Sequence, residues 1–381
     1  MLYIIFVMRI LQLGKFYPIH GGVEKVMYDL LIGLTQRGIH CDMLCANFDV
    51  REKGFIKSIN DIGSLICSSS IMKVSSTMIS PSMVLKLRKM CNDYDIIHVH
   101  HPDPMAALSL WLSGYKGKVI LHWHSDIIKQ KNLLKFYLPL QTWLINRADV
   151  IFGTTPVYLL ESPYLRSVQN KCEVLPIGIS PILPDEKKVL EIKERYNGKK
   201  IVFSLGRLVS YKGFKYLVDA AKYLSDDYII LIGGDGNLKK ELQEQIIKSR
   251  LSEKVKLLGR VSDDDLPNYY GACDVYCLSS IHKTEAFAIV QIEAMSCGKP
   301  VVATKIPGSG VSWVNADGES GLNVEPENSK ALAEAIYKIL GDTEQYQKYS
   351  TGARERFAQL FKKENMIDSV LNYYQKELSC K

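Results

Sequence analysis

The sequence predicts an α/β protein made of two Rossmann-like domains, and three observations lead to this prediction. The chain has 381 residues, which is more than one ordinary hydrophobic core needs and suits two domains of roughly 150–200 residues each. Short apolar runs alternate with segments of helical periodicity along the whole chain. The alternation falls into two separate series. Each series is typical of a parallel sheet with helices on both faces.

The first series predicts an N-terminal domain over residues 1–180. Its helix at residues 22–36 repeats apolar side chains at intervals of three and four, as an amphipathic helix does. Residues 1–7 precede the pattern and could be an extension from an upstream start. The expected strands are residues 9–13, 41–46, 96–100, 119–122, 150–153 and 171–175.

The second series predicts a C-terminal domain over residues 186–362. A segment rich in glycine and proline, residues 177–187, precedes it and is expected to link the two domains. A last helix at residues 363–378 follows after the series is complete. The expected strands are residues 200–205, 228–233, 255–259, 275–278, 300–303 and 321–324.

Composition excludes several classes of protein. Apolar residues make up 47% and charged residues 23%, which is globular rather than disordered. A net charge of +7 is too small for a dedicated nucleic-acid binder. It suits an enzyme that handles phosphates or lies near an anionic membrane, and an ordinary basic surface would give the same value. Nine cysteines without a CxxC spacing indicate free thiols in a reducing, cytoplasmic compartment. We expect neither a signal peptide nor a membrane span.

Two turns in the second half favour phosphate binding. Gly206 follows the first strand of that half and lets the backbone approach a ligand, while Arg207 and Lys212 can reach the crevice at the carboxyl end of the sheet. Arginine offers a planar fork to phosphate oxygens and lysine a point charge. Gly234, in the GGDG turn after the next strand, permits similarly close contact. Either turn by itself could be an ordinary solvated turn.

A third segment carries the strongest indication. Glu285 precedes a short apolar helix that we expect to end at Gly298, a typical C-terminal cap. The start of this helix would offer the backbone N–H groups of Phe287, Ala288 and Ile289 together with the positive end of the helix dipole. Such a helix N-terminus is suited to a diphosphate.

Glu293 lies further along the same helix and could accept hydrogen bonds from the two hydroxyls of a ribose. Other interpretations exist for each glutamate. Glu285 could stabilise the helix dipole, and Glu293 could belong to a buried ion pair. The two could also form the paired carboxylates of a glycosidase. The basic turn with Arg207 and Lys212 favours instead a site that binds a phosphorylated donor.

The first half offers a second group of candidates. Gly21 and Gly22 follow the first strand and open a helix, so a phosphate or sugar could approach the helix N-terminus; a plain strand–helix turn would look alike. Five histidines stand at the ends of two predicted strands: His98, His100, His101, His122 and His124.

A zinc site is the rival interpretation of these histidines. A His-x-His spacing on a strand places both rings on one face, and Asp103 and Asp126 could complete a metal site of a hydrolase. No HExxH helix accompanies them, and this hypothesis leaves the second half unexplained. We therefore expect most of these rings to pack at strand ends. Three aspartates at 263–265 follow Ser262, a candidate helix N-cap, and we interpret them as acidic first-turn residues rather than metal ligands.

The two glutamates with seven residues between them resemble glycosyltransferase family 4. The segments GRLVSYKG, EAMSCGKPVVAT, GKFYPIHGGVEKVMYDL and GLNVEPEN match the pattern of that family, and the resemblance covers nearly the whole chain. It implies a retaining enzyme of the GT-B fold, with two Rossmann-like domains that face each other across a cleft. It also implies that the last helix, within residues 363–381, crosses back to the first domain.

The resemblance assigns roles to single residues. Arg207 and Lys212 would bind the donor diphosphate, Glu285 would orient the donor sugar and Glu293 would bind the ribose. The loop with Gly21 and Gly22 would close over the donor phosphates. His124 matches the active-site histidine of the family, which contacts the donor sugar. We expect no essential metal, because Arg207, Lys212 and the helix dipole can offset the charge of the leaving diphosphate.

The expected reaction transfers a hexose from UDP-galactose, UDP-glucose or GDP-mannose to a polyprenyl-diphosphate-linked saccharide in O-antigen or lipopolysaccharide synthesis. Attack on the same face of the sugar, with the departing phosphate taking the acceptor proton, is the favoured mechanism. A basic apolar segment at residues 127–147, with Lys129, Lys131 and Lys135, could contact the inner face of the cytoplasmic membrane or could be an ordinary core helix. A small soluble acceptor is the alternative. A non-catalytic binding protein would not need the intact glutamate pair.

Overall fold

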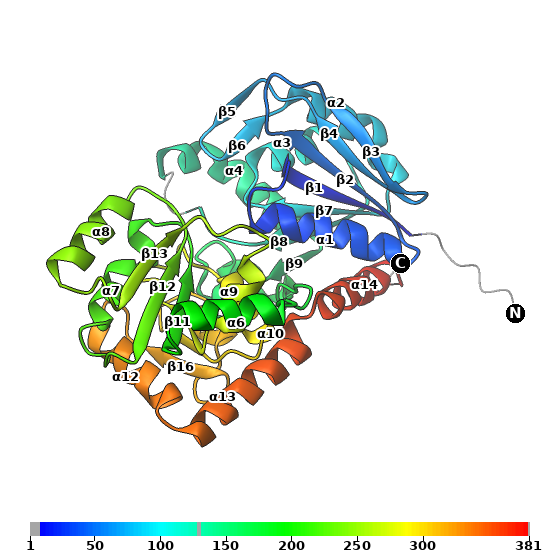
Figure 1. Ribbon diagram of the computed structural model, residues 1–381. Coiled ribbons are helices and arrows are strands. Elements are labelled where there is room, and N and C mark those ends of the chain that lie inside the picture. The colour runs from blue at the N-terminus through cyan, green and yellow to red at the C-terminus, as the bar shows by residue number, and fades with distance from the viewer. Residues whose placement is uncertain (1–7, 128–130, 380–381) are drawn as a thin grey trace, which may run out of the picture. The chain divides into compact units, whose positions relative to one another are not determined.

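The computed structural model describes residues 8–127 and 131–379. The chain divides into two compact units (Figure 1). The first comprises Met1–Gly178 together with Lys363–Lys381, and the second comprises Ile179–Lys362. The hypothesis about residues 1–7 lies outside the described residues. Within those residues, no helix has both the length and the hydrophobicity needed to cross a membrane.

The first unit contains an eight-stranded sheet in the order β10-β9-β8-β7-β1-β2-β4-β3, parallel except for the edge strand β3. A small antiparallel pair, β5 and β6, lies outside it. The strands are β1 (Arg9–Tyr17), β2 (His40–Asn47), β3 (Phe55–Asn60), β4 (Gly63–Ser68), β5 (Met72–Val74), β6 (Thr77–Ile79), β7 (Ile96–His101), β8 (Lys118–Trp123), β9 (Val150–Gly153) and β10 (Cys172–Val174). The six strands expected from the sequence are all present, and β3 to β6 are additional.

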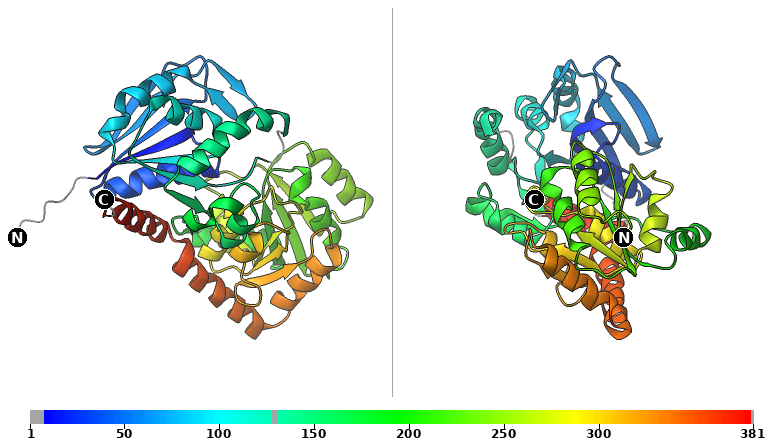
Figure 2. Two further views of the ribbon diagram at one scale, coloured as in Figure 1. Left: turned by 180° about the vertical axis from the view of Figure 1, so that it is seen from behind. Right: turned by 60° about the vertical axis from the view of Figure 1, so that its left-hand side comes forward.

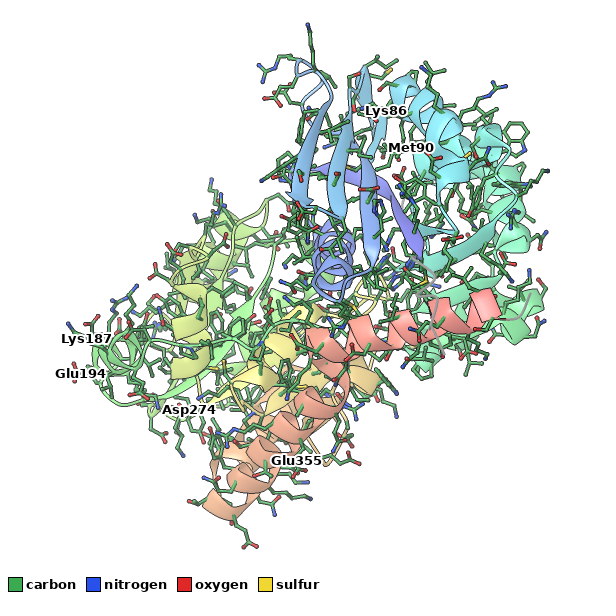
Figure 3. The ribbon with its side chains drawn as sticks, turned by 90° about the vertical axis from the view of Figure 1, so that its right-hand side faces the viewer. Lys86, Met90, Lys187, Glu194, Asp274 and Glu355 are labelled. Carbon is green, nitrogen blue, oxygen red and sulfur yellow. The ribbon has the colours of Figure 1, made fainter. Side chains whose placement is uncertain are left out.

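Helices cover both faces of this sheet. Proline at the first turn of α2, α3 and α5 fixes a helical φ where no N–H partner is needed. On α2, Lys86, labelled in Figure 3, donates a hydrogen bond to the Cys67 carbonyl of β4 at 3.1 Å, which ties this helix to the strand next to the edge strand β3. The helices are α1 (Gly22–Gln36), α2 (Pro81–Met90), α3 (Pro104–Ser113), α4 (Lys131–Arg147), α5 (Pro156–Glu161) and α14 (Lys363–Ser379), with short 3₁₀ turns η1 (Cys91–Asp93) and η2 (Arg166–Lys171).

The last helix, α14, belongs to the first unit, as the resemblance implied. It lies beside α1 (Figure 1). Gly33 of α1 faces Ile367 of α14 so closely that a Cβ at position 33 would lie 2.0 Å from the Ile367 Cδ1 atom. Arg37 Nε donates to Asp368 Oδ1 at 2.6 Å next to this contact. The glycine therefore permits the close approach of the two helices.

The second unit is built on a six-stranded parallel sheet in the order β13-β12-β11-β14-β15-β16. Its strands match the second predicted series to within one residue at each end. They are β11 (Lys200–Leu205), β12 (Tyr228–Gly233), β13 (Val255–Gly259), β14 (Val275–Leu278), β15 (Val301–Thr304) and β16 (Gly321–Val324). These strands are mostly buried, as expected for a parallel sheet covered on both faces.

A core of apolar side chains fills the space between this sheet and α7, α8 and α12. Helices α9 and α10 cover the other face, and α12 and α13, orange in Figure 2, lie along the β16 edge. The helices of this unit are α6 (Glu186–Arg195), α7 (Phe214–Ala220), α8 (Lys239–Lys248), α9 (Leu266–Ala272), α10 (Ile289–Ser296), α11 (Val311–Val314), α12 (Ser329–Leu340) and α13 (Thr343–Arg356), with the turns η3 (Ser210–Lys212) and η4 (Phe357–Phe361).

Two local predictions differ from the structure. The expected linker at residues 177–187 ends early, because Asp185 caps α6 by accepting hydrogen bonds from the N–H groups of Lys187 and Lys188 at 2.9 and 3.2 Å. The aspartates at 263–265 do not form the first turn of a helix. They occupy a turn before α9, in which Ser262 Oγ accepts from the Asp265 N–H at 3.1 Å rather than capping the helix.

Candidate functional site

The second sheet changes direction between β11 and β14. From β11 the chain proceeds outward to β12 and β13, and it then returns to place β14 on the other side of β11. The loops that follow β11 and β14 therefore leave the sheet in opposite directions. The carboxyl ends of strands at such a switch point are where open α/β sheets bind ligands.

The loops after β11 and β14 are joined through their backbones. The Ile281 N–H donates to the Tyr211 carbonyl at 2.8 Å, and Ser279 Oγ donates to the Lys212 carbonyl at 3.0 Å. Gly213 adopts a left-handed φ of 65°, and a Cβ there would lie 2.1 Å from the Ser279 carbonyl oxygen. Only glycine allows this approach, which holds Lys212 over the end of β14.

Lys212 and Glu285 form an ion pair at this point. The Lys212 Nζ atom lies 2.5 Å from Glu285 Oε2, and each side chain is only 11% exposed. Ser280 Oγ donates to the same carboxylate oxygen at 2.9 Å, and Ser309 Oγ donates to the Glu285 carbonyl. The charge pair and its hydrogen bonds together fix both side chains, as a buried ion pair requires. The structure thus brings together two residues that the sequence placed in separate motifs.

Arg207 lies close to this pair but is exposed. Its Nη2 atom donates to the Tyr211 hydroxyl at 3.4 Å, and the Tyr211 ring in turn lies 5.8 Å from Lys212 Nζ. An exposed guanidinium beside a buried ammonium gives one accessible and one fixed positive charge, which is an arrangement suited to a polyanionic ligand.

The helix after Glu285 begins later than predicted. Helix α10 starts at Ile289, so Phe287 and Ala288 belong to the turn before it. Ala288 has φ 63° and ψ 75°, a left-handed conformation that is strained for alanine and redirects the chain into the helix. Among the described residues, the N–H groups of Phe287, Ala288 and Ile289 have no hydrogen-bond partner. The end of the helix is as predicted, with Gly298 at φ 69°.

Glu293 lies about one turn into α10. The Tyr270 hydroxyl donates to Glu293 Oε2 at 2.5 Å, so the carboxylate has a tyrosine partner and not the buried ion pair considered above. Burial raises the pKa of the Glu293 carboxyl, and the hydrogen bond from Tyr270 opposes this rise. A carboxylate can accept about four hydrogen bonds, so it retains acceptor sites for ribose hydroxyls.

Gly234 has a structural role in its turn. At φ 130°, a Cβ on this residue would lie 1.9 Å from the Gly206 carbonyl oxygen. Its N–H donates to the Gly259 carbonyl at 2.7 Å, while the Gly206 N–H donates to the Gly233 carbonyl at 3.0 Å. The glycine lets the two turns pack against each other, and its N–H already has a partner.

In the first unit, Gly21 and Gly22 are exposed at the start of α1. Gly21 is the N-cap, and its φ of −152° is extended backbone that any residue can adopt. Glu24 Oε2 would lie 2.8 Å from a Cβ at position 21, so a larger residue there would require the end of the Glu24 side chain to move. A bare, exposed helix start remains accessible to a ligand.

The histidines of β7 and β8 lie on both faces of the first sheet. His100 pairs in register with His122, so His98, His100, His122 and His124 share the face covered by α14. His101 lies on the other face, where its ring stacks on Trp123 at 3.7 Å between centroids. Burial lowers the pKa of all five rings, to about 3 for His101 and His122.

Three of these rings come close enough to be tested as a metal site. One nitrogen each from His98, His100 and His122 lies within 4.8 Å of the others. However, His98 and His100 stack face to face at 4.6 Å and 18°, and both nitrogens of His100 already have partners. Lone pairs lie in the ring planes, so stacked rings do not converge on one ion. The rival hydrolase interpretation receives no support from this geometry.

The aspartates proposed to complete that site have other partners. Asp103 caps α3 by accepting from the Met105 N–H at 3.0 Å. Asp126 Oδ1 accepts from Trp123 Nε1 at 2.9 Å and from Ser162 Oγ at 2.8 Å. The prediction that catalysis needs no metal stays a prediction.

Sequence reasoning missed several residues of the site. Ser280, Ser309 and Tyr270 hold the two glutamates, and Gln12 and Tyr374 bind the histidine cluster. Ser280 could have been found, since it follows a buried strand at the sheet's carboxyl end. The others make contacts between distant parts of the chain that no local pattern reports.

Comparison with known proteins identifies the family. The model "Glycosyltransferase Family 4" matches residues 20–181, and "Glycosyl transferases group 1" matches residues 185–356. The O-antigen chain mannosyltransferase C of Escherichia coli is 30% identical over 98% of this chain and 100% of its own. The D-rhamnosyltransferase WbpZ of Pseudomonas aeruginosa is 29% identical over 93% of this chain and 92% of its own. The chain belongs to glycosyltransferase family 4 and is a hexosyltransferase.

A further relative and a solved structure complete the comparison. An N-acetylgalactosaminyltransferase of Campylobacter jejuni, whose name specifies a diphospho-undecaprenol acceptor, is 28% identical over 77% of this chain and 80% of its own. The crystal structure of Anabaena Alr3699/HepE with UDP superimposes with a TM-score of 0.78 at 21% identity, over 97% of this chain and 100% of that one. The predicted GT-B fold is confirmed.

Proposed function

We propose that this enzyme transfers a hexose, with retention of the anomeric configuration, from a nucleotide diphosphate sugar to a polyprenyl-diphosphate-linked saccharide. One observation carries the proposal. At the switch point of the second sheet, the Lys212–Glu285 ion pair lies beside Arg207 and the unpaired N–H groups before α10. Positive charge for a leaving diphosphate and a carboxylate for sugar hydroxyls are thereby placed together.

In this mechanism Glu285 holds the sugar and does not attack it. Its carboxylate is neutralised by Lys212 and accepts from Ser280, so it is a hydrogen-bond acceptor in a fixed position rather than an unpaired nucleophile. Arg207 and Lys212 offset the charge that develops on the diphosphate, and the leaving phosphate takes the proton of the attacking hydroxyl. Glu293 binds the ribose. No step requires a metal ion.

We further propose roles for residues of the first unit, considered by itself: His124 contacts the transferred sugar, and Gly21 and Gly22 bind the donor phosphates. The relatives favour one donor among UDP-galactose, UDP-glucose and GDP-mannose. One relative is a mannosyltransferase and another transfers D-rhamnose, a 6-deoxy analogue of mannose. Among these donors, we propose GDP-mannose.

A lipid-linked acceptor suits the surface of the first unit. Phe136 on α4 is 86% exposed, and Leu133 exposes further apolar surface on the same helix. Trp111 on α3, which packs against α4, and Leu85 on α2, which packs against α3, are exposed as well. Lys135 adds an exposed positive charge next to Phe136, whereas Lys129 lies outside the described residues. Apolar side chains beside basic ones bind anionic bilayers, and we propose peripheral binding to the inner face of the cytoplasmic membrane.

Release of nucleoside diphosphate from a panel of sugar nucleotides tests the donor, and NMR of the product anomer tests retention. Lys212→Ala should abolish both hydrolysis and transfer. Lys215→Ala is the matched control, because Lys215 is exposed on α7 three residues further on. Undiminished turnover in Lys212→Ala would contradict the site. Activity that EDTA removes and only a divalent ion restores would contradict the metal-free mechanism.

Flotation with vesicles tests the membrane surface. The protein should float with vesicles that contain anionic lipid, and Phe136→Ser should weaken this binding without changing hydrolysis of the donor in solution. Equal flotation of both proteins would show that this surface does not bind the membrane. Transfer to a small soluble glycoside at the rate seen with the lipid-linked acceptor would favour the alternative acceptor class.

A further inference from the structure

A buried hydrogen-bonded chain connects the last helix to His124. Tyr374 of α14 is fully buried, and its hydroxyl lies 3.1 Å from Gln12 Nε2 and 2.6 Å from His98 Nδ1. Gln12 Oε1 lies 2.8 Å from His100 Nε2, and His100 Nδ1 lies 2.9 Å from His124 Nε2. All members of the chain belong to the first unit.

The direction of each hydrogen bond follows from the amide of Gln12. Its Nε2 group donates to the Tyr374 hydroxyl and lies 3.9 Å from Cys41 Sγ, and its Oε1 atom faces His100 Nε2 at 2.8 Å. An amide oxygen can only accept, and His100 must therefore carry its proton on Nε2. Since burial keeps the ring neutral, Nδ1 of His100 has a lone pair and accepts from His124.

His124 is consequently the tautomer with its proton on Nε2. Among the described residues, the His124 ring makes its hydrogen bond through Nε2, and its other nitrogen, Nδ1, has no partner. Unlike both nitrogens of His122, this atom is not completely enclosed by the protein, and His124 is 6% exposed whereas the other four rings are at most 1% exposed. Nδ1 of His124 is thus a hydrogen-bond acceptor that a ligand can reach. The tyrosine is consistent with this direction, because it accepts from Gln12 and donates its own proton to His98 Nδ1.

We propose that Tyr374 and Gln12 are positioning residues that fix the tautomer of His124, so that His124 Nδ1 accepts a hydrogen bond from a hydroxyl of the transferred sugar. The sugar contact rests on the proposed function, whereas the tautomer does not. The proposal gives the returning helix α14 a role in the first unit beyond packing on α1. A neutral imidazole whose partner fixes the tautomer is a common device in binding and catalytic sites.

The tautomer can be measured without substrate. In protein labelled with ¹⁵N at its histidine rings, and with His124 assigned by comparison with His124→Gln, the ¹⁵N shifts should show a protonated Nε2 and a bare Nδ1. Tyr374→Phe removes the acceptor of the Gln12 amide and should let the Nδ1–H tautomer appear, and Gln12→Met should do so more strongly. Tyr373→Phe is the matched control. This neighbour on α14 donates to Glu173 at 3.0 Å and takes no part in the hydrogen bonds that connect Tyr374 to His124.

A bare Nε2 on His124 of the unmodified protein would overturn the proposal, as would a tautomer unchanged by both Tyr374→Phe and Gln12→Met. With the donor selected by the nucleotide-release panel, Tyr374→Phe should lower kcat/KM about tenfold, the scale of one misdirected hydrogen bond, while Tyr373→Phe should not. A changed tautomer with unchanged kcat/KM would overturn the sugar contact. Absence of turnover with every donor would contradict the proposed function and leave the tautomer result decisive for the hydrogen-bonded chain.

Discussion

Lowering the pH from 7.0 to 5.5 should destabilise the first unit far more than the second. Five buried imidazoles lie in the first unit, and burial lowers the pKa of each below its ordinary value of 6.5. In the second unit the only histidine of the sequence is His282, which makes hydrogen bonds in an exposed turn. The perturbation therefore acts on one unit through a set of groups that the other lacks.

The sign and size follow from proton linkage. Below pH 6.5 the unfolded chain binds protons on these rings, but the folded unit does not until about pH 3 for His101 and His122. Stability is thus present above pH 6.5 and is lost as the pH falls toward 3. At pH 5.5 each of these two histidines costs about 1.3 kcal/mol relative to pH 7.0, and the three other buried rings, whose pKa burial also lowers, act in the same direction. Asp103, whose pKa burial raises, acts in the opposite direction and reduces the total.

Tryptophan fluorescence can follow the first unit by itself. The chain has four tryptophans, and Trp313→Phe leaves Trp111, Trp123 and Trp143, all in the first unit. Denaturant titrations of this variant should show a much lower midpoint at pH 5.5 than at pH 7.0. Amide hydrogen exchange on peptides of the second unit should change little once the intrinsic pH effect is removed. Equal midpoints at the two pH values would refute the picture of buried, neutral rings.

Three further substitutions have defined outcomes. Gly33→Ala should lower the thermal midpoint, because its Cβ would clash with Ile367, and a second change, Ile367→Ala, should recover part of the loss; no loss in the single variant would show that α14 does not pack as described. Gly234→Ala should cost at least about 2 kcal/mol of unfolding free energy through strain and overlap, and a wild-type denaturation curve would contradict this. Tyr270→Phe should raise the donor KM several-fold, and increasingly at lower pH, because Glu293 loses a hydrogen bond that opposes its raised pKa; an unchanged KM would separate Glu293 from donor binding.

The strands of the second unit were predicted from sequence because each is a continuous apolar run between turn residues. The hairpin strands at residues 55–68 escaped prediction for the opposite reason. Strand β3 lies at the sheet edge with most of its side chains exposed or half-buried, so Phe55–Asn60 has no clear apolar pattern. The start of α10 was not predicted correctly either, because alanine rarely adopts the left-handed conformation that Ala288 has before this helix.

The candidate site could be predicted as a set of residues but not as a set of contacts. Arg207, Lys212 and Glu285 stood out because charged residues follow buried strands, and this depends only on local order. That Lys212 and Glu285 pair with each other depends on Gly213 and Ser279 joining two loops 67 residues apart. The contacts of Tyr374 with Gln12 and His98 join still more distant parts of the sequence, and no local pattern predicts them.

The Lys212–Glu285 ion pair can stabilise the fold of the second unit and also belong to the proposed donor site. Two charges that are each 11% exposed would be costly if either stood alone, and removing one partner of a buried pair commonly costs about 3–5 kcal/mol. The pairing holds both side chains in fixed positions, with Ser280 as a further partner of the glutamate. Under the proposed function, a diphosphate that approaches Lys212 would meet a positive charge already in position, so little reorganisation would be needed. The lysine would then share its protons with phosphate oxygens while Ser280 continues to hold the glutamate.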